Sequence, residues 1–147
     1  MSEHDTGAGN GVTGGCYCGR IRYEARFPSR FVGHCHCNNC RRAHGAAFVT
    51  WAGFPDGQLR FLAGGDELAH WTTDTGATRS FCPTCGSTLF FRSERWPNET
   101  HLAVGNLDGP LDREPSGHVY ADRSPSWCPT LGDSLPRCGG ESGMDPL

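Results

Sequence analysis

The residues best suited to chemistry lie in one cysteine-rich stretch, His34-Cys35-His36-Cys37-Asn38-Asn39-Cys40-Arg41-Arg42. Its three cysteines follow a C-x-C-x-x-C spacing, with two histidines beside them. Thiolates are nucleophiles and soft metal ligands, and a tight loop can point several sulfurs at one ion. The spacing therefore predicts a metal site on Cys35, Cys37 and Cys40, in preference to a chance cluster of structural thiols.

Two further cysteine pairs have the spacing of metal ligands. Cys16 and Cys18 are two residues apart, so in an extended chain both side chains lie on one side. Cys82 and Cys85 belong to Phe81-Cys82-Pro83-Thr84-Cys85-Gly86, a C-P-x-C-G turn that is typical of zinc knuckles. Two cysteines cannot complete a tetrahedral site, so this turn needs a second pair.

Spacing alone offers two partner pairs for the turn. Cys37 and Cys40 would complete an ordinary zinc ribbon with it, which leaves three clustered cysteines unused. Cys16 and Cys18 would complete a four-cysteine site and leave the C-x-C-x-x-C triplet as a separate centre. We favour the second arrangement, with two zinc ions per chain, because it uses all seven clustered cysteines.

Composition indicates that the fold needs metal ions or disulfides to stabilise it. Only 24 of the 147 residues are Leu, Ile, Val or Phe, whereas Gly and Pro account for 31. The nine cysteines are an odd number, and residues 1–15 have no apolar segment typical of an export signal. These features favour a reducing cytoplasm and zinc over disulfides.

Membrane and nucleic-acid partners are both disfavoured by the sequence. It has no run of about eighteen apolar residues of the kind that would span a membrane. The isoelectric point of about 6.1 and the lack of a basic cluster argue against nucleic acid.

The elements that must position these cysteines are predicted to be β-strands. Residues 20–27 alternate strictly, with Ile21, Tyr23, Ala25 and Phe27 on one face. Further strands are predicted at 46–51, 58–62, 67–73, 78–81, 87–92, 100–104 and 118–121, with a helical turn at 40–45. We expect a mainly β fold, a single domain of packed antiparallel sheets stapled by zinc, over residues 13–127. A disordered tail (1–12) and an irregular C-terminal tail (128–147) flank it, and Cys128 and Cys138 have no motif around them.

Several side chains near the triplet are candidates for secondary roles. Arg41 and Arg42 either bind a substrate carboxylate or balance the charge of the thiolates. His44 is expected either on the surface or beside the metal site, and not as a ligand. Phe48 and Trp51 are candidate walls of an apolar pocket, although a core role is favoured for both.

The sequence resembles the glutathione-dependent formaldehyde-activating enzyme family, which includes centromere protein V. The resemblance is carried by Gly15-Cys16-Tyr17-Cys18-Gly19, by 34–42 with Gly45-Ala46 and Phe48, by 81–87, by Gly105-Asn106-Leu107-Asp108 and by His118-Val119-Tyr120. It implies packed β-sheets, a structural zinc on Cys16, Cys18, Cys82 and Cys85, and a catalytic zinc on Cys35, Cys37 and Cys40. It also implies the family's named reaction, which adds glutathione to formaldehyde and is classed with the carbon–sulfur lyases.

Two functional hypotheses follow. A three-cysteine site leaves a fourth position for a substrate thiol or thiol adduct, which favours an enzyme. A non-enzymatic interaction module would instead close both sites, with His34, His36 or another residue as the fourth ligand.

Overall fold

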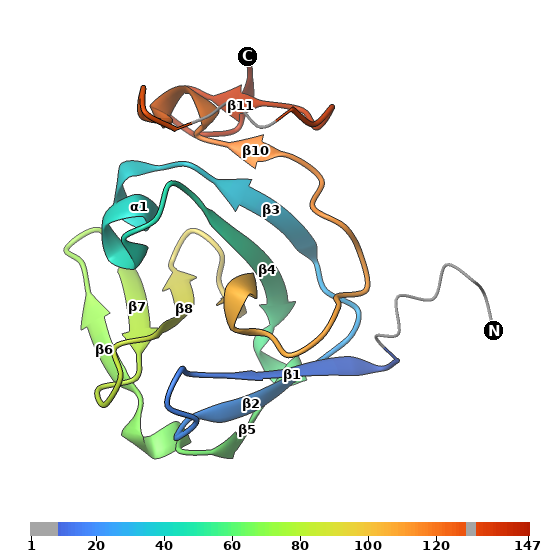
Figure 1. The fold of residues 1–147 in the computed structure, drawn as a ribbon, viewed down its shortest axis with the longest axis vertical. Helices are drawn as coiled ribbons and strands as arrows, with labels where there is room; N and C mark the ends of the chain where they lie inside the picture. Colours follow the sequence, from blue (N-terminus) through green and yellow to red (C-terminus); the bar gives the residue numbers. More distant parts are fainter. Residues whose placement is uncertain (1–8, 129–131) are drawn as a thin grey trace.

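The computed structural model describes residues 9–128 and 132–147, which are built mainly of β-strands joined by turns (Figure 1). The strands are β1 (Gly11–Gly15), β2 (Arg22–Arg26), β3 (Phe31–Cys35), β4 (Val49–Pro55), β5 (Leu59–Ala63), β6 (Ala69–Thr72), β7 (Ala77–Phe81), β8 (Thr88–Ser93), β9 (Glu99–Ala103), β10 (His118–Val119), β11 (Cys138–Gly139) and β12 (Asp145–Pro146). One α-helix, α1 (Asn38–His44), and short 3₁₀ turns at Asp56–Gln58, Gly65–Glu67, Val104–Asn106 and Ala121–Arg123 complete the elements of the described chain.

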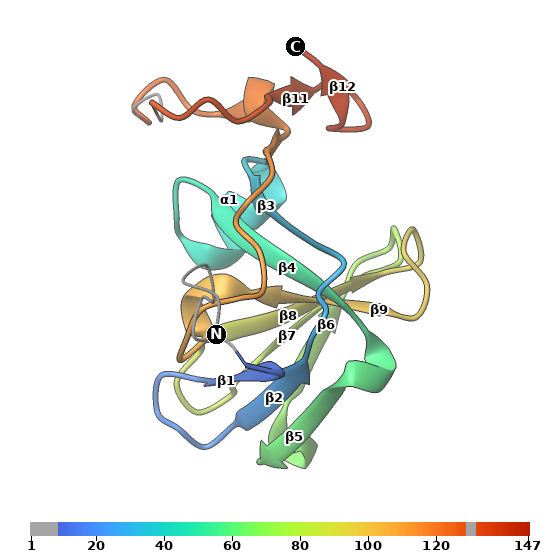
Figure 2. The same cartoon turned by 90° about the vertical axis from the view of Figure 1, so that its right-hand side faces the viewer.

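The strands of the described chain form two main sheets and one small ribbon. The larger sheet has the order β10-β3-β4-β9-β8-β7-β6, and the smaller has the order β1-β2-β5. All pairings are antiparallel except that of β10 with β3. The ribbon pairs β11 with β12. In Figures 1 and 2 the segment from β10 to the C-terminus lies at one end of the molecule, beyond β3 and α1.

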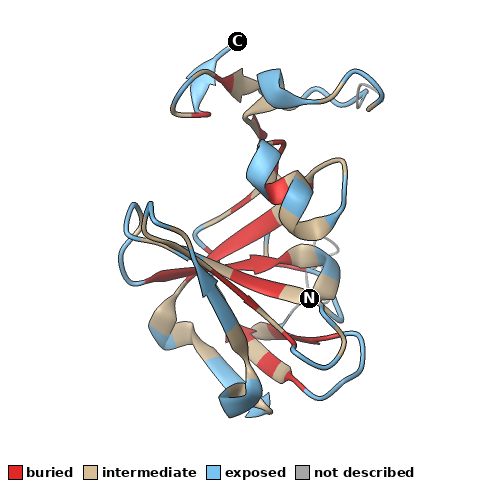
Figure 3. Cartoon of the chain, turned by 90° about the vertical axis from the view of Figure 1, so that its left-hand side faces the viewer, coloured by how far each residue is buried: buried red, intermediate tan, exposed pale blue. Residues whose placement is uncertain are grey.

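A first core packs the inner face of the smaller sheet against the larger one. Ile21 and Tyr23 are fully buried on the small-sheet side, and Phe54 and Leu102 on the other. The ring of Tyr23 meets that of Phe90 edge-on, with centroids 4.9 Å apart. Figure 3 shows this buried centre, with exposed residues at the edges. The alternation predicted for residues 20–27 is confirmed, because Ile21, Tyr23 and Ala25 all lie in the core.

A second, smaller core lies on the other face of the larger sheet, beneath α1. It consists of Cys35, Cys40, Val49, Trp51 and Ala103. Strand β4 serves both cores because its side chains alternate. Ala52 and Phe54 enter the first core, whereas Val49 and Trp51 enter the second.

The domain begins earlier than the sequence predicted. Strand β1 starts at Gly11, and the side chain of Val12 is buried in the first core. Residues 1–12 were expected to form a tail, but Val12 anchors their end in the core. Residues 1–8 of that tail lie outside the described residues. The C-terminal segment is also less irregular than expected, since β11 and β12 pair within it.

The predicted class, a mainly β fold of packed antiparallel sheets, is confirmed. Within the described ranges, no helix has the length and apolar character needed to cross a membrane.

Candidate functional site

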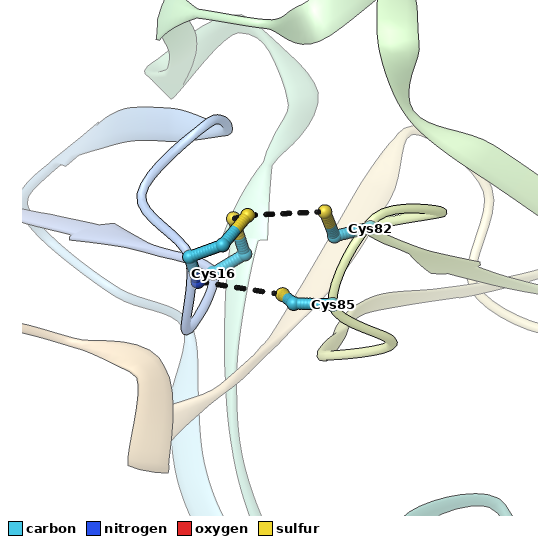
Figure 4. Close-up of side chains that lie close together, drawn as sticks. Cys16, Cys82 and Cys85 are labelled. Atoms are coloured by element: carbon cyan, nitrogen blue, oxygen red, sulfur yellow. Dashed lines mark hydrogen bonds between the residues drawn. The ribbon is translucent and has the colours of Figure 1, made fainter.

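Four cysteines from two distant loops meet at the edge of the first core, and we call them the first cysteine cluster: Cys16, Cys18, Cys82 and Cys85. Cys16 and Cys18 follow β1, while Cys82 and Cys85 follow β7. Their sulfurs all lie within 4.8 Å of one another. Figure 4 shows Cys16 facing the turn that carries Cys82 and Cys85. The cluster thus joins the smaller sheet to the larger one.

The spacing of these sulfurs fits a tetrahedral metal site. Zinc–sulfur bonds of about 2.3 Å place the sulfurs of a tetrahedron about 3.8 Å apart. The Sγ atoms of Cys16 and Cys18 are 3.6 Å apart, and those of Cys18 and Cys82 are 3.8 Å apart. A disulfide would need about 2.05 Å. The arrangement therefore suits four thiolates around one ion.

Backbone and hydroxyl donors favour the thiolate form of Cys16 and Cys85 in the first cluster. The amide of Ile21 donates to Cys16 Sγ at 3.3 Å, and that of Cys18 donates to Cys85 Sγ at 3.4 Å. Hydrogen bonds from the hydroxyl and the backbone N–H of Ser87 lower the pKa of Cys85 to about 5. Gly86, at φ 81°, gives the turn its left-handed residue.

The predicted triplet forms a second cysteine cluster, Cys35, Cys37 and Cys40, in the second core. Its three sulfurs also lie within 4.8 Å of one another, and those of Cys35 and Cys40 are 3.6 Å apart. Cys35 ends β3, Cys37 is the N-cap of α1, and Cys40 lies in its first turn. The loop brings the sulfurs together because Cys37 Sγ accepts a hydrogen bond from the amide of Cys40 at 3.2 Å.

The contacts among the three thiols shift their pKa values in different directions. Hydrogen bonds from the thiols of Cys35 and Cys40 lower the pKa of Cys37. The same contacts, with burial, raise the pKa of Cys35. Cys37 is also more exposed than the other two.

Sequence reasoning missed a buried cation beside the second cluster, Arg79 on β7. Its Nη2 atom donates to Cys40 Sγ at 3.8 Å, and its guanidinium lies 4.9 Å from the centre of the Phe91 ring. His44, at the end of α1, packs edge-on against Trp51, with ring centroids 5.2 Å apart. Burial and the charge of Arg79 lower the pKa of His44 to about 4. Arg79 is 39 residues from Cys40, so no local signal connects them.

The two candidate carboxylate-binding residues differ in availability. Arg41 Nη2 donates to Asn38 Oδ1 at 2.6 Å within α1, and its Nε is buried. Arg42 is exposed on the same helix. Arg42 is thus the more accessible of the two cations.

A chain of hydrogen bonds behind the second cluster links it to the C-terminal segment. It runs Ser124 Oγ to His36 Nδ1 (2.9 Å), His36 Nε2 to His118 Nδ1 (2.8 Å) and His118 Nε2 to Asp133 (3.0 Å). The Asp133 carboxylate only accepts, so His118 donates to it, His36 donates to His118, and Ser124 donates to His36. Both nitrogens of His36 are thereby used on the side away from the sulfurs.

The ring of Phe48 packs against those of His34 and His36, beside this series of hydrogen bonds. The Nδ1 atom of His34 hydrogen-bonds the hydroxyl of Thr50 at 2.8 Å. Trp51 lies in the second core. Trp51 therefore has the core role favoured for it, whereas Phe48 is half-buried and belongs to neither core.

All nine cysteines lie in the described ranges, and none of them forms a disulfide. Cys128 and Cys138 belong to neither cluster. The ribbon alternative, which pairs Cys37 and Cys40 with Cys82 and Cys85, is not the arrangement found, since these pairs lie in different clusters.

Comparison with known proteins identifies the family of this chain. The family model for glutathione-dependent formaldehyde-activating enzyme matches residues 11–123, and the chain belongs to that family. It is 28% identical over 78 residues to an uncharacterized lyase of Schizosaccharomyces pombe, a match covering 53% of this chain and 55% of the relative. The match thus spans about half the length of that curated relative.

A solved structure is similar as well. The crystal structure of a Rhodobacter sphaeroides protein has 30% sequence identity and a TM-score of 0.57, and the match covers 69% of this chain and 92% of that one. The fold is thus shared with that solved structure.

Proposed function

We propose that this protein is a zinc-dependent enzyme of the carbon–sulfur lyase type, acting on a thiol, glutathione in the family's named reaction, and a small aldehyde such as formaldehyde. The observation that carries the proposal is the contrast between the two clusters. The first has four sulfurs, which close a tetrahedron, whereas the second has three, which leave one position for substrate.

The proposed reaction adds a thiol across a carbonyl group. The sulfur attacks the carbonyl carbon, a carbon–sulfur bond forms, and the proton that leaves the sulfur ends on the oxygen as a hydroxyl group. The reverse reaction breaks the same bond. A zinc ion held by Cys35, Cys37 and Cys40 would supply a site that lowers the pKa of the substrate thiol. Zinc in the first cluster would have a structural role only.

The chain's own residues would orient the substrate. Arg42, exposed on α1 near the second cluster, would attract a carboxylate of the thiol substrate, and Arg41 would add to the positive potential. Trp51 and Phe91, with ring centroids 5.8 Å apart, pack in the second core beside the cluster, so the inner side of the cluster is apolar.

The interaction-module alternative requires a protein ligand at the fourth position. In the described chain, the metal-ligating groups that converge at the second cluster are its three cysteines. Both nitrogens of His36 are hydrogen-bonded to other residues. One ring nitrogen of His34, Nδ1, is likewise hydrogen-bonded, to the hydroxyl of Thr50. These contacts support the enzyme over the module.

The test is the rate of exchange between formaldehyde plus glutathione and S-(hydroxymethyl)glutathione, followed by exchange NMR with zinc-loaded protein. We expect acceleration by the unmodified protein and at least a 100-fold loss for Cys37→Ser, since one of three ligands is removed. Cys138→Ser, outside both clusters, is the matched control and should keep full activity. A Cys37→Ser protein as fast as the unmodified one would contradict the proposal.

A further inference from the structure

Arg79 is a buried cation in the middle of β7, directly opposite Trp71 on β6 and Phe91 on β8. Only 9% of the residue is exposed. One arm of its guanidinium, Nη2, points to Cys40 Sγ, and one face covers the ring of Phe91. The other arm, Nη1, is buried with no hydrogen-bond partner among the described residues.

A buried guanidinium needs a negative partner, because an unpaired charge is strongly disfavoured in a low-dielectric interior. The arginines that form ion pairs in the described chain are Arg20, Arg22, Arg30, Arg60, Arg92, Arg113 and Arg137. Among the described residues, no carboxylate lies within 4.0 Å of the Arg79 guanidinium. Its polar contact is a sulfur of the second cluster, so the thiolates are its counter-charge.

The second cluster, in turn, needs a cation. Three thiolates around a divalent ion leave one negative charge in excess, and a fourth, substrate thiolate adds another. Arg79 supplies one positive charge at a fixed position behind Cys40. It therefore reduces the electrostatic cost of adding an anionic sulfur, while its N–H bond holds the Cys40 side chain in place.

We propose that Arg79 is a positioning residue of the second cluster, which acts through Cys40 to secure a metal ion and to make an anionic fourth ligand acceptable there. The inference rests on the proposed function, because it takes the second cluster as a zinc site. Arg79 comes from β7, whereas the three cysteines of the site all come from residues 35–40.

The test measures zinc affinity at each cluster by competition with a chromophoric chelator, using Arg79→Gln and Arg79→Lys. We expect Arg79→Gln to weaken the second zinc about 10–100-fold and to leave the first zinc unchanged. Arg79→Lys, which keeps the charge but not the planar fork, should restore part of that loss. The control is Arg92→Gln on the adjacent strand β8, which removes an exposed positive charge from a pair with Asp56 and should alter neither affinity.

The retained first zinc reports that the two sheets are still joined, so loss of fold is separated from loss of the second site. Should Arg79→Gln fail to fold, Arg79→Lys carries the test, with a second-site affinity below that of the unmodified protein. A folded variant that binds both ions normally, or loses both equally, would overturn the inference. An unmodified protein that binds only one ion would instead overturn the proposed function.

Discussion

At the scale of single residues, His44 shows how burial beside a cation controls protonation. Its folded pKa of about 4 lies below the usual value because of burial and then the charge of Arg79. The unfolded chain, with a histidine pKa of about 6.5, therefore binds a proton that the folded chain excludes. The stability that His44 confers is complete above about pH 6.5 and declines as pH falls from there toward 4.

This predicts a pH-dependent difference between the unmodified protein and His44→Gln. The free energy of unfolding, measured by denaturant titration from pH 7 to pH 4.5, should fall more steeply in the unmodified protein, by on the order of 2 kcal/mol over the range. Both proteins have the same cysteines, so any metal contribution cancels in the difference. Parallel curves would show that His44 is not protonated on unfolding in this range.

Cysteine positions were predictable from the sequence because chelating loops are local. Cys35, Cys37 and Cys40 lie within six residues, so their convergence follows from one short turn. Arg79 was not predictable, because its contact with Cys40 depends on how β7 lies beside α1. His36 did carry a usable signal: between two cysteines in an extended segment, its side chain must point away from theirs.

At the scale of elements, the C-terminal segment is held to the second cysteine loop by buried histidines. His118 on β10 is 1% exposed and joins His36 to Asp133. Removing it leaves the Nε2 atom of His36 buried without a partner, which costs about 1–3 kcal/mol, beyond the loss of the His118–Asp133 bond.

We therefore predict that His118→Leu lowers the free energy of unfolding by about 2–4 kcal/mol and speeds tryptic cleavage after Arg137. The control is His70→Leu on the exposed edge strand β6, which loses a hydrogen bond to Ser80 and should lower stability by about 1 kcal/mol without speeding cleavage after Arg137. Equal protease resistance in the two variants would show that the histidine chain does not hold the segment.

The strands show a similar division between what is local and what is not. Alternation identified β2 and its buried face, since Ile21, Tyr23 and Ala25 meet one core. The end of β4 at Pro55 was not evident, because the strand is buried on both faces and its residues do not alternate in polarity. The pairing of β10 with β3 joins residues more than 80 apart, and no pattern in the sequence specifies it.

At the scale of the whole molecule, the two clusters lie in two different cores, on opposite faces of the larger sheet. The first joins the sheets, so its metal would stabilise the fold. The second lies under α1 beside Arg79 and Arg42, so its metal would face substrate. One ion would thus serve folding and the other the reaction, in a chain with few large aliphatic residues.

The most direct measurement is the zinc content of protein purified without added metal, with Cys37→Ser alongside. We predict about two zinc ions per chain in the unmodified protein and about one in the variant, which remains folded. One ion in the unmodified protein, or none, would contradict the assignment of two separate sites.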